Sequence, residues 1–248
     1  MDFTLTEEQT LLRESARRYF ADATQKASHR GDRGKAWADI VQMGWLSVVI
    51  PTELGGFGGS IIDGCLLARE LGRGHIGVPF AESAILGAKT FANDPRMLEQ
   101  IAQGQVKPAY ALQDDAEPLT FQRRDGGYIL LGAKPFVRFA SDTNMLIVKA
   151  FDEVKNVPAV FGLSKDSPAL KLDSYPTLDG IGATSLAFES HVIGDDSCLA
   201  IGEAAHKLID GLELAMCLAF SAEAVGLMEF LVDATVNILR CAPSLGSH

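Results

Sequence analysis

The sequence predicts an α+β protein: an N-terminal helical domain, a central antiparallel β domain, and then the first helix of an incomplete C-terminal helical bundle. Two changes of hydrophobic periodicity carry this prediction. Apolar residues recur at helical spacing to about residue 104, in short β-type runs over 105–200, and at helical spacing again from Ala204. We therefore place the domains at residues 1–104, 105–200 and 201–248. This order differs from an alternating Rossmann sheet, and no G-x-G-x-x-G segment follows a strand.

The N-terminal domain begins with a capping box at Thr6–Gln9, where the threonine hydroxyl and the glutamine side chain each satisfy a free backbone N–H group. Apolar positions at helical spacing then predict a series of helices. Their core segments are residues 12–20, 37–43, 61–71, 80–91 and 97–102, with a short buried run at 46–50.

The central domain is defined by short β-type runs separated by turn signals such as Asp125-Gly126-Gly127 and Asp166-Ser167-Pro168. The expected strands are residues 110–112, 128–131, 145–150, 159–163 and 185–188. Their spacing is typical of an antiparallel sheet module.

The last helix is expected over Ala204–Arg240, roughly 50 Å long and apolar around most of its circumference. In a monomer it would expose a large apolar face, so we expect a dimer or higher oligomer that pairs these helices. The helical pattern stops at Cys241–His248, where Pro243 and Gly246 do not continue it. This ending predicts an unfinished helical domain.

Composition narrows the functions. With 248 residues, 47% of them apolar, and a formal charge of −10, a globular chain is expected, and one without the basic face that nucleic acid requires. The four cysteines lack C-x-x-C spacing and the histidines are dispersed, so no disulfide, zinc or other metal site is expected and a cytoplasmic location is favoured. We find no signal peptide and no unbroken apolar run of roughly 18–20 residues, so no membrane span is expected.

The densest local signal is the glycine-rich loop Pro51–Ser60. Its glycines allow positive φ angles and close backbone approach, so the loop could fold tightly or contact a ligand, and the helix that follows could attract an anion at its N-terminus. Spacing alone favours a tight connection between helices without a ligand.

Together with Gly44-Trp45-Leu46, this loop resembles the acyl-CoA dehydrogenase family, whose members show a Gly-Trp pair followed by Pro-x-Glu-x-Gly-Gly-x-Gly. The opening Phe3-x-x-Thr6-Glu7-Glu8-Gln9, the helix–sheet–helix order and the segment Ala222–Gly226 are also similar to the family. Several departures indicate a diverged bacterial branch. The resemblance implies FAD between the sheet domain and the C-terminal helices, with an acyl-CoA thioester beside it. In such enzymes a glutamate removes the α-proton while a hydride leaves the β-carbon for the flavin.

The resemblance carries over to named positions only in part. On the first strand, Tyr110, Leu112 and Gln113 correspond to flavin-facing positions, with Gln113 where threonine is usual. On the second strand motif, Phe136 and Arg138 are the corresponding cofactor-binding candidates, the arginine facing either the pyrophosphate or water. The serine that usually meets the pyrophosphate has no counterpart in Ala116–Pro118. Ordinary strand packing remains the alternative for each position.

The catalytic base is unknown from the sequence. The family places it beyond this chain's end or, in some relatives, at the position of Met216. Glu213 and Glu223 are weak candidates, and each has the alternative of a buried structural carboxylate or a surface charge. The chain alone is therefore expected to be inactive, with FAD absent or weakly bound.

The ending fits a frameshift just before the family's Arg-x-Gln-Phe-Gly segment, since another frame over Arg240–Gly246 permits Leu-Arg-Thr-Gln-Phe-Gly. Three hypotheses follow. In the first, the chain is one part of an FAD-dependent acyl-CoA dehydrogenase of fatty acid or lipid metabolism, and a second polypeptide supplies the remaining helices. In the second, it is an inactive remnant that binds acyl-CoA as an oligomer. The third is a structural or interaction protein without a ligand.

Overall fold

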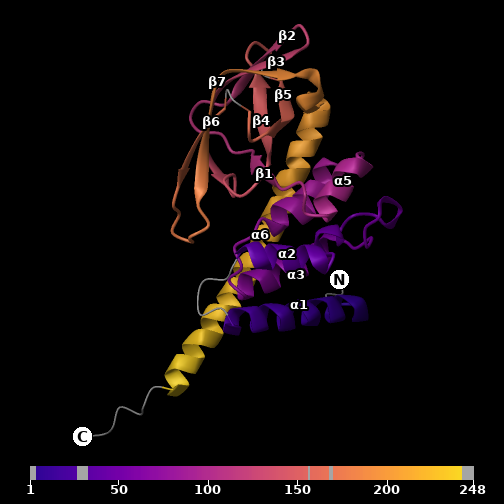
Figure 1. The fold of residues 1–248 in the computed structure, drawn as a ribbon, viewed down its shortest axis with the longest axis vertical. Coiled ribbons are helices and arrows are strands. Elements are labelled where there is room, and N and C mark those ends of the chain that lie inside the picture. Colours follow the sequence, from indigo (N-terminus) through magenta and orange to yellow (C-terminus); the bar gives the residue numbers. More distant parts are fainter. Residues whose placement is uncertain (1–3, 27–32, 156, 168–169, 242–248) are drawn as a thin grey trace, which may run out of the picture.

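The computed structural model describes residues 4–26, 33–155, 157–167 and 170–241, and Figure 1 shows how their helices gather below a twisted sheet. Phe3 of the opening motif and the tail 242–248, with its proposed frameshift, lie outside the described residues. The fold is α+β, as the periodicity predicts: helices first, then a mostly antiparallel sheet, then one long helix.

The helical part has the expected series of helices. Its α-helices are α1 (Glu7–Lys26), α2 (Arg33–Gln42), α3 (Ile61–Arg73), α4 (Ala88–Thr90) and α5 (Pro95–Ala102), with 3₁₀ turns η1 (Trp45–Ser47) and η2 (Thr52–Leu54). The capping box of α1 is confirmed, because the Gln9 N–H donates to Thr6 Oγ1 at 3.1 Å and the Thr6 N–H donates to Gln9 Oε1 at 3.2 Å.

The helix expected over residues 80–91 differs from the prediction. Most of it, η3 (Ala81–Gly87), is a π-helix, and only the short α4 follows as α-helix. All residues of η3 are buried, and a Cβ at Gly87 would come 3.0 Å from Ile101. The π-helical turn of η3 is wider and less favourable than an α-helical turn. Side chains packed around it on every side stabilise it.

The sheet contains β1 (Pro108–Ala111), β2 (Thr120–Arg124), β3 (Gly127–Arg138), β4 (Met145–Asp152), β5 (Pro158–Ser164), β6 (Leu170–Tyr175), β7 (Ala183–Gly194) and β8 (Cys198–Ile201), the last preceded by the 3₁₀ turn η4 (Asp195–Ser197). The order is β6-β7-β3-β2-β4-β5-β8, with β1 also paired to β4. The expected strands are all present, but the sheet is not wholly antiparallel. Both β1 and β2 pair with β4 in parallel, because their connections return the chain in the same direction.

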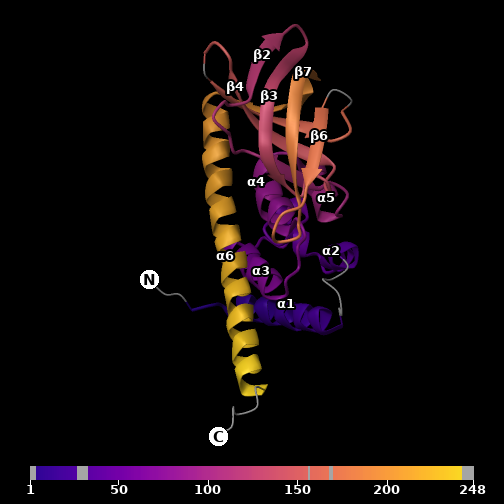
Figure 2. The same cartoon turned by 90° about the vertical axis from the view of Figure 1, so that its left-hand side faces the viewer.

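The last described element is α6 (Glu203–Cys241), a helix of 39 residues that is therefore about 58 Å long. Figure 1 shows α6 running from the sheet past α3 and α1, and in Figure 2 it forms one edge of the molecule. Among the described residues, α6 is the one helix long and apolar enough to cross a membrane, and 17% of its most apolar window is buried. The sequence predicts this helix but no unbroken apolar run of spanning length, and charged residues such as Glu213 and Glu223 do interrupt its apolar residues. A core helix that packs among others passes the same test.

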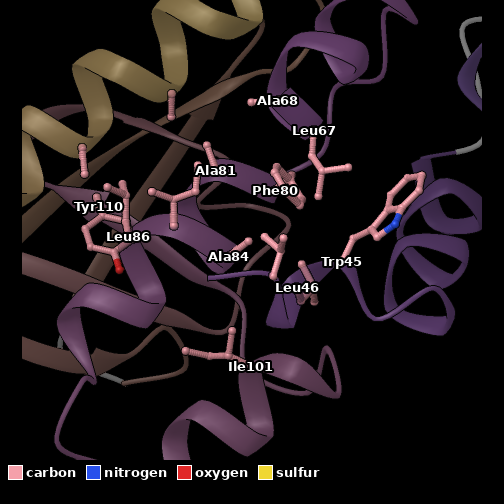
Figure 3. Close-up of a cluster of buried hydrophobic side chains, with 14 of the residues drawn as sticks. Trp45, Leu46, Leu67, Ala68, Phe80, Ala81, Ala84, Leu86, Ile101 and Tyr110 are labelled. Atoms are coloured by element: carbon pink, nitrogen blue, oxygen red, sulfur yellow. The ribbon is translucent and has the colours of Figure 1, made fainter. Parts of the chain in front are cut away.

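Two hydrophobic clusters hold the fold. One lies within the sheet, around Phe121, Phe161 and Phe188. The other, partly drawn in Figure 3, joins the N-terminal helices to α6 and to one side of β1, where Tyr110 packs. Because the second cluster spans all three parts of the chain, the helices and the sheet meet along a shared apolar surface.

Helices α3 and α6 cross at glycines. A Cβ at Gly72 would stand 2.0 Å from the Glu223 carbonyl oxygen, and a Cβ at Gly226 would stand 1.8 Å from the Arg69 carbonyl oxygen. Only glycine permits this backbone-to-backbone contact. Ion pairs flank the crossing, with Arg73 reaching Glu229 at 3.2 Å.

The loop Pro51–Ser60 folds onto its own backbone. The N–H groups of Gly56, Gly58 and Gly59 donate to the carbonyls of Pro51, Ile50 and Val48, at 3.0, 2.8 and 2.9 Å. The Ser60 N–H that opens α3 donates to Asp63 Oδ2 at 2.7 Å. With these donors engaged inside the loop, the structure favours the tight connection over a ligand-binding loop.

Candidate functional site

A pocket opens where β1, β3, η3 and α6 meet, with about 430 Å³ of empty space that is partly open to solvent. The lining combines the end of β1 (Tyr110, Leu112, Gln113), the end of β3 (Phe136, Arg138), the face of α6 (Met216, Phe220) and one residue of η3, Glu82.

The β1 side of the pocket is set by strand alternation. Tyr110 and Leu112 point toward the helical core, whereas Ala109 and Ala111 between them face the core of the sheet. The Tyr110 hydroxyl lies 2.9 Å from Thr90 Oγ1, which in turn donates to the Leu86 carbonyl at 2.9 Å. Burial raises the pKa of Tyr110, so this phenol stays neutral.

A β-bulge sets the β3 side. The pairing of β3 with β7 shifts register between Lys134 and Val137, at Pro135, which has no N–H group to donate. After the bulge, Phe136 and Arg138 share one face of the strand, and Val137 enters the core of the sheet. The bulge thereby directs both candidate residues toward the pocket.

Arg138 lies between aromatic rings and a carboxylate. Its guanidinium carbon is 4.7 Å from the centroid of Phe220, and a terminal nitrogen is 3.9 Å from Glu223 Oε1. A second, more open hollow shares Phe136 and Arg138 and continues along Thr177–Asp179 to Gly182, with about 680 Å³ of empty space. Arg138 therefore stands where the two hollows join.

A charge cluster that includes the buried Lys134 fixes the end of β1 next to Gln113. Asp114 accepts from Lys134 Nζ at 2.5 Å and from Lys149 Nζ at 2.8 Å. Burial would raise the pKa of Asp114, but the two ammonium groups lower it on balance, and burial lowers the pKa of Lys134. The carboxylate is thus held ionised and gives the strand end a fixed position.

The predicted cofactor-binding residues Tyr110, Leu112, Gln113, Phe136 and Arg138 all line this one pocket. Whether they contact a cofactor stays a prediction. Two lining residues, Phe220 and Glu82, were not singled out from the sequence. Glu82 was missed because a lone glutamate in an apolar helix carries no motif. Its one sequence signal is a charge inside an otherwise apolar run.

The weak candidates for the base are placed differently. Glu213 is exposed on α6 and does not line the pocket. Glu223 is half-buried beside Arg138, and burial raises its pKa against the pull of that arginine. Met216 lines the pocket at the position where some relatives place the base. Within the described part of the chain, no group of three or more histidine, cysteine or acidic side chains could hold a metal ion.

Known proteins resemble this chain in sequence and in fold. The family model described as "Acyl-CoA dehydrogenase, N-terminal domain" matches residues 6–95. Isovaleryl-CoA dehydrogenase of Pongo abelii is 23% identical over 98% of this chain, and the acyl-CoA dehydrogenase IpdE2 of Mycobacterium tuberculosis is 34% identical over 45% of it. The chain is therefore similar to the acyl-CoA dehydrogenase family, whose N-terminal domain its residues 6–95 match. It covers 64% of the length of the first relative and 39% of the second.

Solved structures share the fold of this chain. The ChsE4–ChsE5 complex of Mycobacterium tuberculosis superposes with a TM-score of 0.86 at 21% identity, covering 99% of this chain and 70% of that one. The structure described as PigA with FAD and proline has a TM-score of 0.85 at 21% identity, covering 100% and 72%. At such identities the likeness establishes the fold alone.

Proposed function

We propose that this chain forms the flavin- and thioester-binding part of an FAD-dependent oxidoreductase that introduces an α,β double bond into an acyl-CoA thioester. The observation that carries the proposal is the convergence of Tyr110, Leu112, Gln113, Phe136 and Arg138 on one pocket against α6. Residues far apart in sequence meet there, which ordinary strand packing does not require. The FAD-containing PigA structure, which shares the fold, adds support.

The residues present fit the ring of FAD. Phe136, Phe220 and Leu112 offer apolar surface for a planar ring, and the Gln113 amide can bond its polar edge. Glu82 Oε1 is buried without a hydrogen-bond partner, as expected of a group that completes its bonding with a ligand. Arg138 is the cation placed for a phosphate, since Lys134 and Lys149 are engaged by Asp114.

Bound FAD would supply the hydride acceptor. This chain's own residues exclude water and orient the ligands. Phe136 is 43% exposed and would become covered when a ring packs on it. Tyr110, tied to Thr90, forms a rigid floor. Met216 cannot accept a proton, so we propose that the described residues bind and orient the thioester without supplying the base of the dehydrogenation.

The assignment is tested by FAD retention after incubation and desalting. Phe136→Ala and Arg138→Gln should each weaken FAD binding about tenfold or more, since each removes a stacking or charged contact of roughly 1.5 kcal/mol. Leu131→Ala, on the same strand but outside the pocket, is the matched control and should bind like wild type. Equal retention by all of these proteins would contradict the pocket assignment.

We also propose that α6 pairs with a partner subunit. Apolar side chains stand exposed along it, among them Leu214, Leu231, Val232 and Ile238. Apolar side chains exposed in such number along one helix favour an interface. The complex of ChsE4 with ChsE5, which shares the fold, is consistent with an assembly of subunits.

A further inference from the structure

The pocket contains a carboxyl group to which the proposed function assigns no specific bonding partner. Glu82 is 4% exposed, and its Oε1 atom has no hydrogen-bond partner among the described residues. Buried polar groups are nearly always paired, so an unpaired carboxyl that lines a pocket marks a place where a ligand supplies the donor.

The side chains that line the pocket with Glu82 supply no hydrogen bond to its free oxygen. The Tyr110 hydroxyl, on β1, is already bonded to Thr90. Arg138, on β3, packs over Phe220 and reaches toward Glu223, and no ion pair links it to Glu82. The α6 side offers Met216 and Phe220, which cannot donate. The charges that act on Glu82 are Arg138, which favours its ionised form, and Glu223, which opposes it.

The position of Glu82 is rigid. It lies on η3, whose residues are all buried, and a Cβ at Gly64 of α3 would come 2.9 Å from Ile85 of η3. π-Helical turns often occur at functional sites because they redirect a side chain. A carboxylate held this firmly cannot relax toward solvent, so its unpaired oxygen is a built feature of the pocket wall.

We propose that Glu82 determines acyl specificity: it accepts a hydrogen bond from a hydroxyl or amine on the acyl group, so that the pocket prefers acyl-CoA thioesters with such a donor over plain hydrocarbon ones. This inference rests on the proposed function. The residues predicted to face the flavin come from β1 and β3, whereas Glu82 comes from the N-terminal helices. The donor could also be an N–H of the flavin ring, and the experiment separates the two sources.

The test measures binding of 3-hydroxybutyryl-CoA and butyryl-CoA by calorimetry, with and without FAD. These ligands differ by one hydroxyl. Wild type should prefer the hydroxyl ligand about tenfold or more, since a site built to pair a hydroxyl leaves an unpaired group with the analogue. Glu82→Leu should abolish the preference, and Glu82→Gln, which keeps an acceptor oxygen, should retain part of it. The same exchange at exposed Glu53, Glu53→Leu, is the control.

Several outcomes would overturn the inference. Equal or better binding of butyryl-CoA by wild type contradicts it while leaving the proposed function intact. Loss of FAD affinity in Glu82→Leu, with the acyl preference unchanged, assigns Glu82 to the ring instead. Flavin bleaching by butyryl-CoA that Glu82→Gln abolishes would make Glu82 a base and reject the specificity role. Absence of binding of both thioesters and FAD to wild type would refute the proposed function as well.

Discussion

Single side chains around the pocket owe their properties to burial. Burial raises the pKa of Glu82 to about 7, against the pull of Arg138. The pKa of Glu82 in the unfolded chain is near 4.5. Between pH 4.5 and about 7, the folded protein therefore keeps a proton on Glu82 that the unfolded chain has lost. The free energy of unfolding should therefore fall as pH rises from about 4.5 to about 7.

Glu82→Leu should remove this contribution. At about 1.4 kcal/mol for each pKa unit, the variant should gain about 3 kcal/mol over wild type across that interval. Urea unfolding of both proteins at several pH values measures the difference, in which the raised pKa values of Glu70 and Glu223 cancel because both proteins contain them. A pH-independent difference between the two proteins would show that Glu82 is not protonated by its surroundings.

Which residues the sequence could predict follows from their local context. Tyr110, Gln113, Phe136 and Arg138 lie on strand segments with a recognisable motif, and strand geometry brings their ends together. The position of Glu82 in the pocket could not be predicted from the sequence, because it depends on a π-helix held by tertiary packing. Glu213 and Glu223 both lie near Met216 along the helix. Helical spacing could not predict that Glu213 is exposed and Glu223 is half-buried, because packing decides this.

At the scale of elements, the crossing of α3 and α6 is the most constrained contact. Gly226→Ala would place a methyl group 1.8 Å from the Arg69 carbonyl oxygen, so the helices must separate. We expect a loss of about 1–3 kcal/mol in the free energy of unfolding, even though alanine favours helix over glycine by about 1 kcal/mol. Thermal unfolding measures the loss.

Gly211 on the same helix provides the matched control. A Cβ there meets the flexible end of Lys89, which can move aside. Gly211→Ala should therefore be neutral or stabilising by up to about 1 kcal/mol. If both substitutions behave alike, the close crossing of the two helices is refuted.

Elements with strong apolar patterns were predictable, and others were not. The strands β2, β6 and β8 escaped prediction because few of their residues are buried; Leu170 is the one buried residue of β6. The parallel pairing of β1 with β4 depends on how the loops return the chain, which hydrophobic alternation does not encode. The predicted domain limits at 104 and 200 remain an interpretation.

At the scale of the whole molecule, α6 joins the sheet to the N-terminal helices and lies along one edge of the molecule (Figure 2). Several of its apolar side chains, among them Leu231, Val232 and Ile238, are exposed. We expect light scattering to give a dimer or a higher oligomer. The double variant Val232→Lys, Ile238→Lys should shift the protein toward monomer, since burying two ammonium groups at an interface is costly. Val154→Lys, 88% exposed on a loop of the sheet, should leave the mass unchanged. A monodisperse wild-type monomer would contradict the interface.

The central claim is that the pocket between the sheet and α6 holds FAD. The most direct measurement is the dissociation constant of FAD, determined by flavin fluorescence with the wild-type protein and with Phe136→Ala. The account predicts saturable binding of one FAD per pocket, weakened about tenfold by the substitution. A wild-type protein that neither retains nor binds FAD, in its oligomeric form, would contradict it.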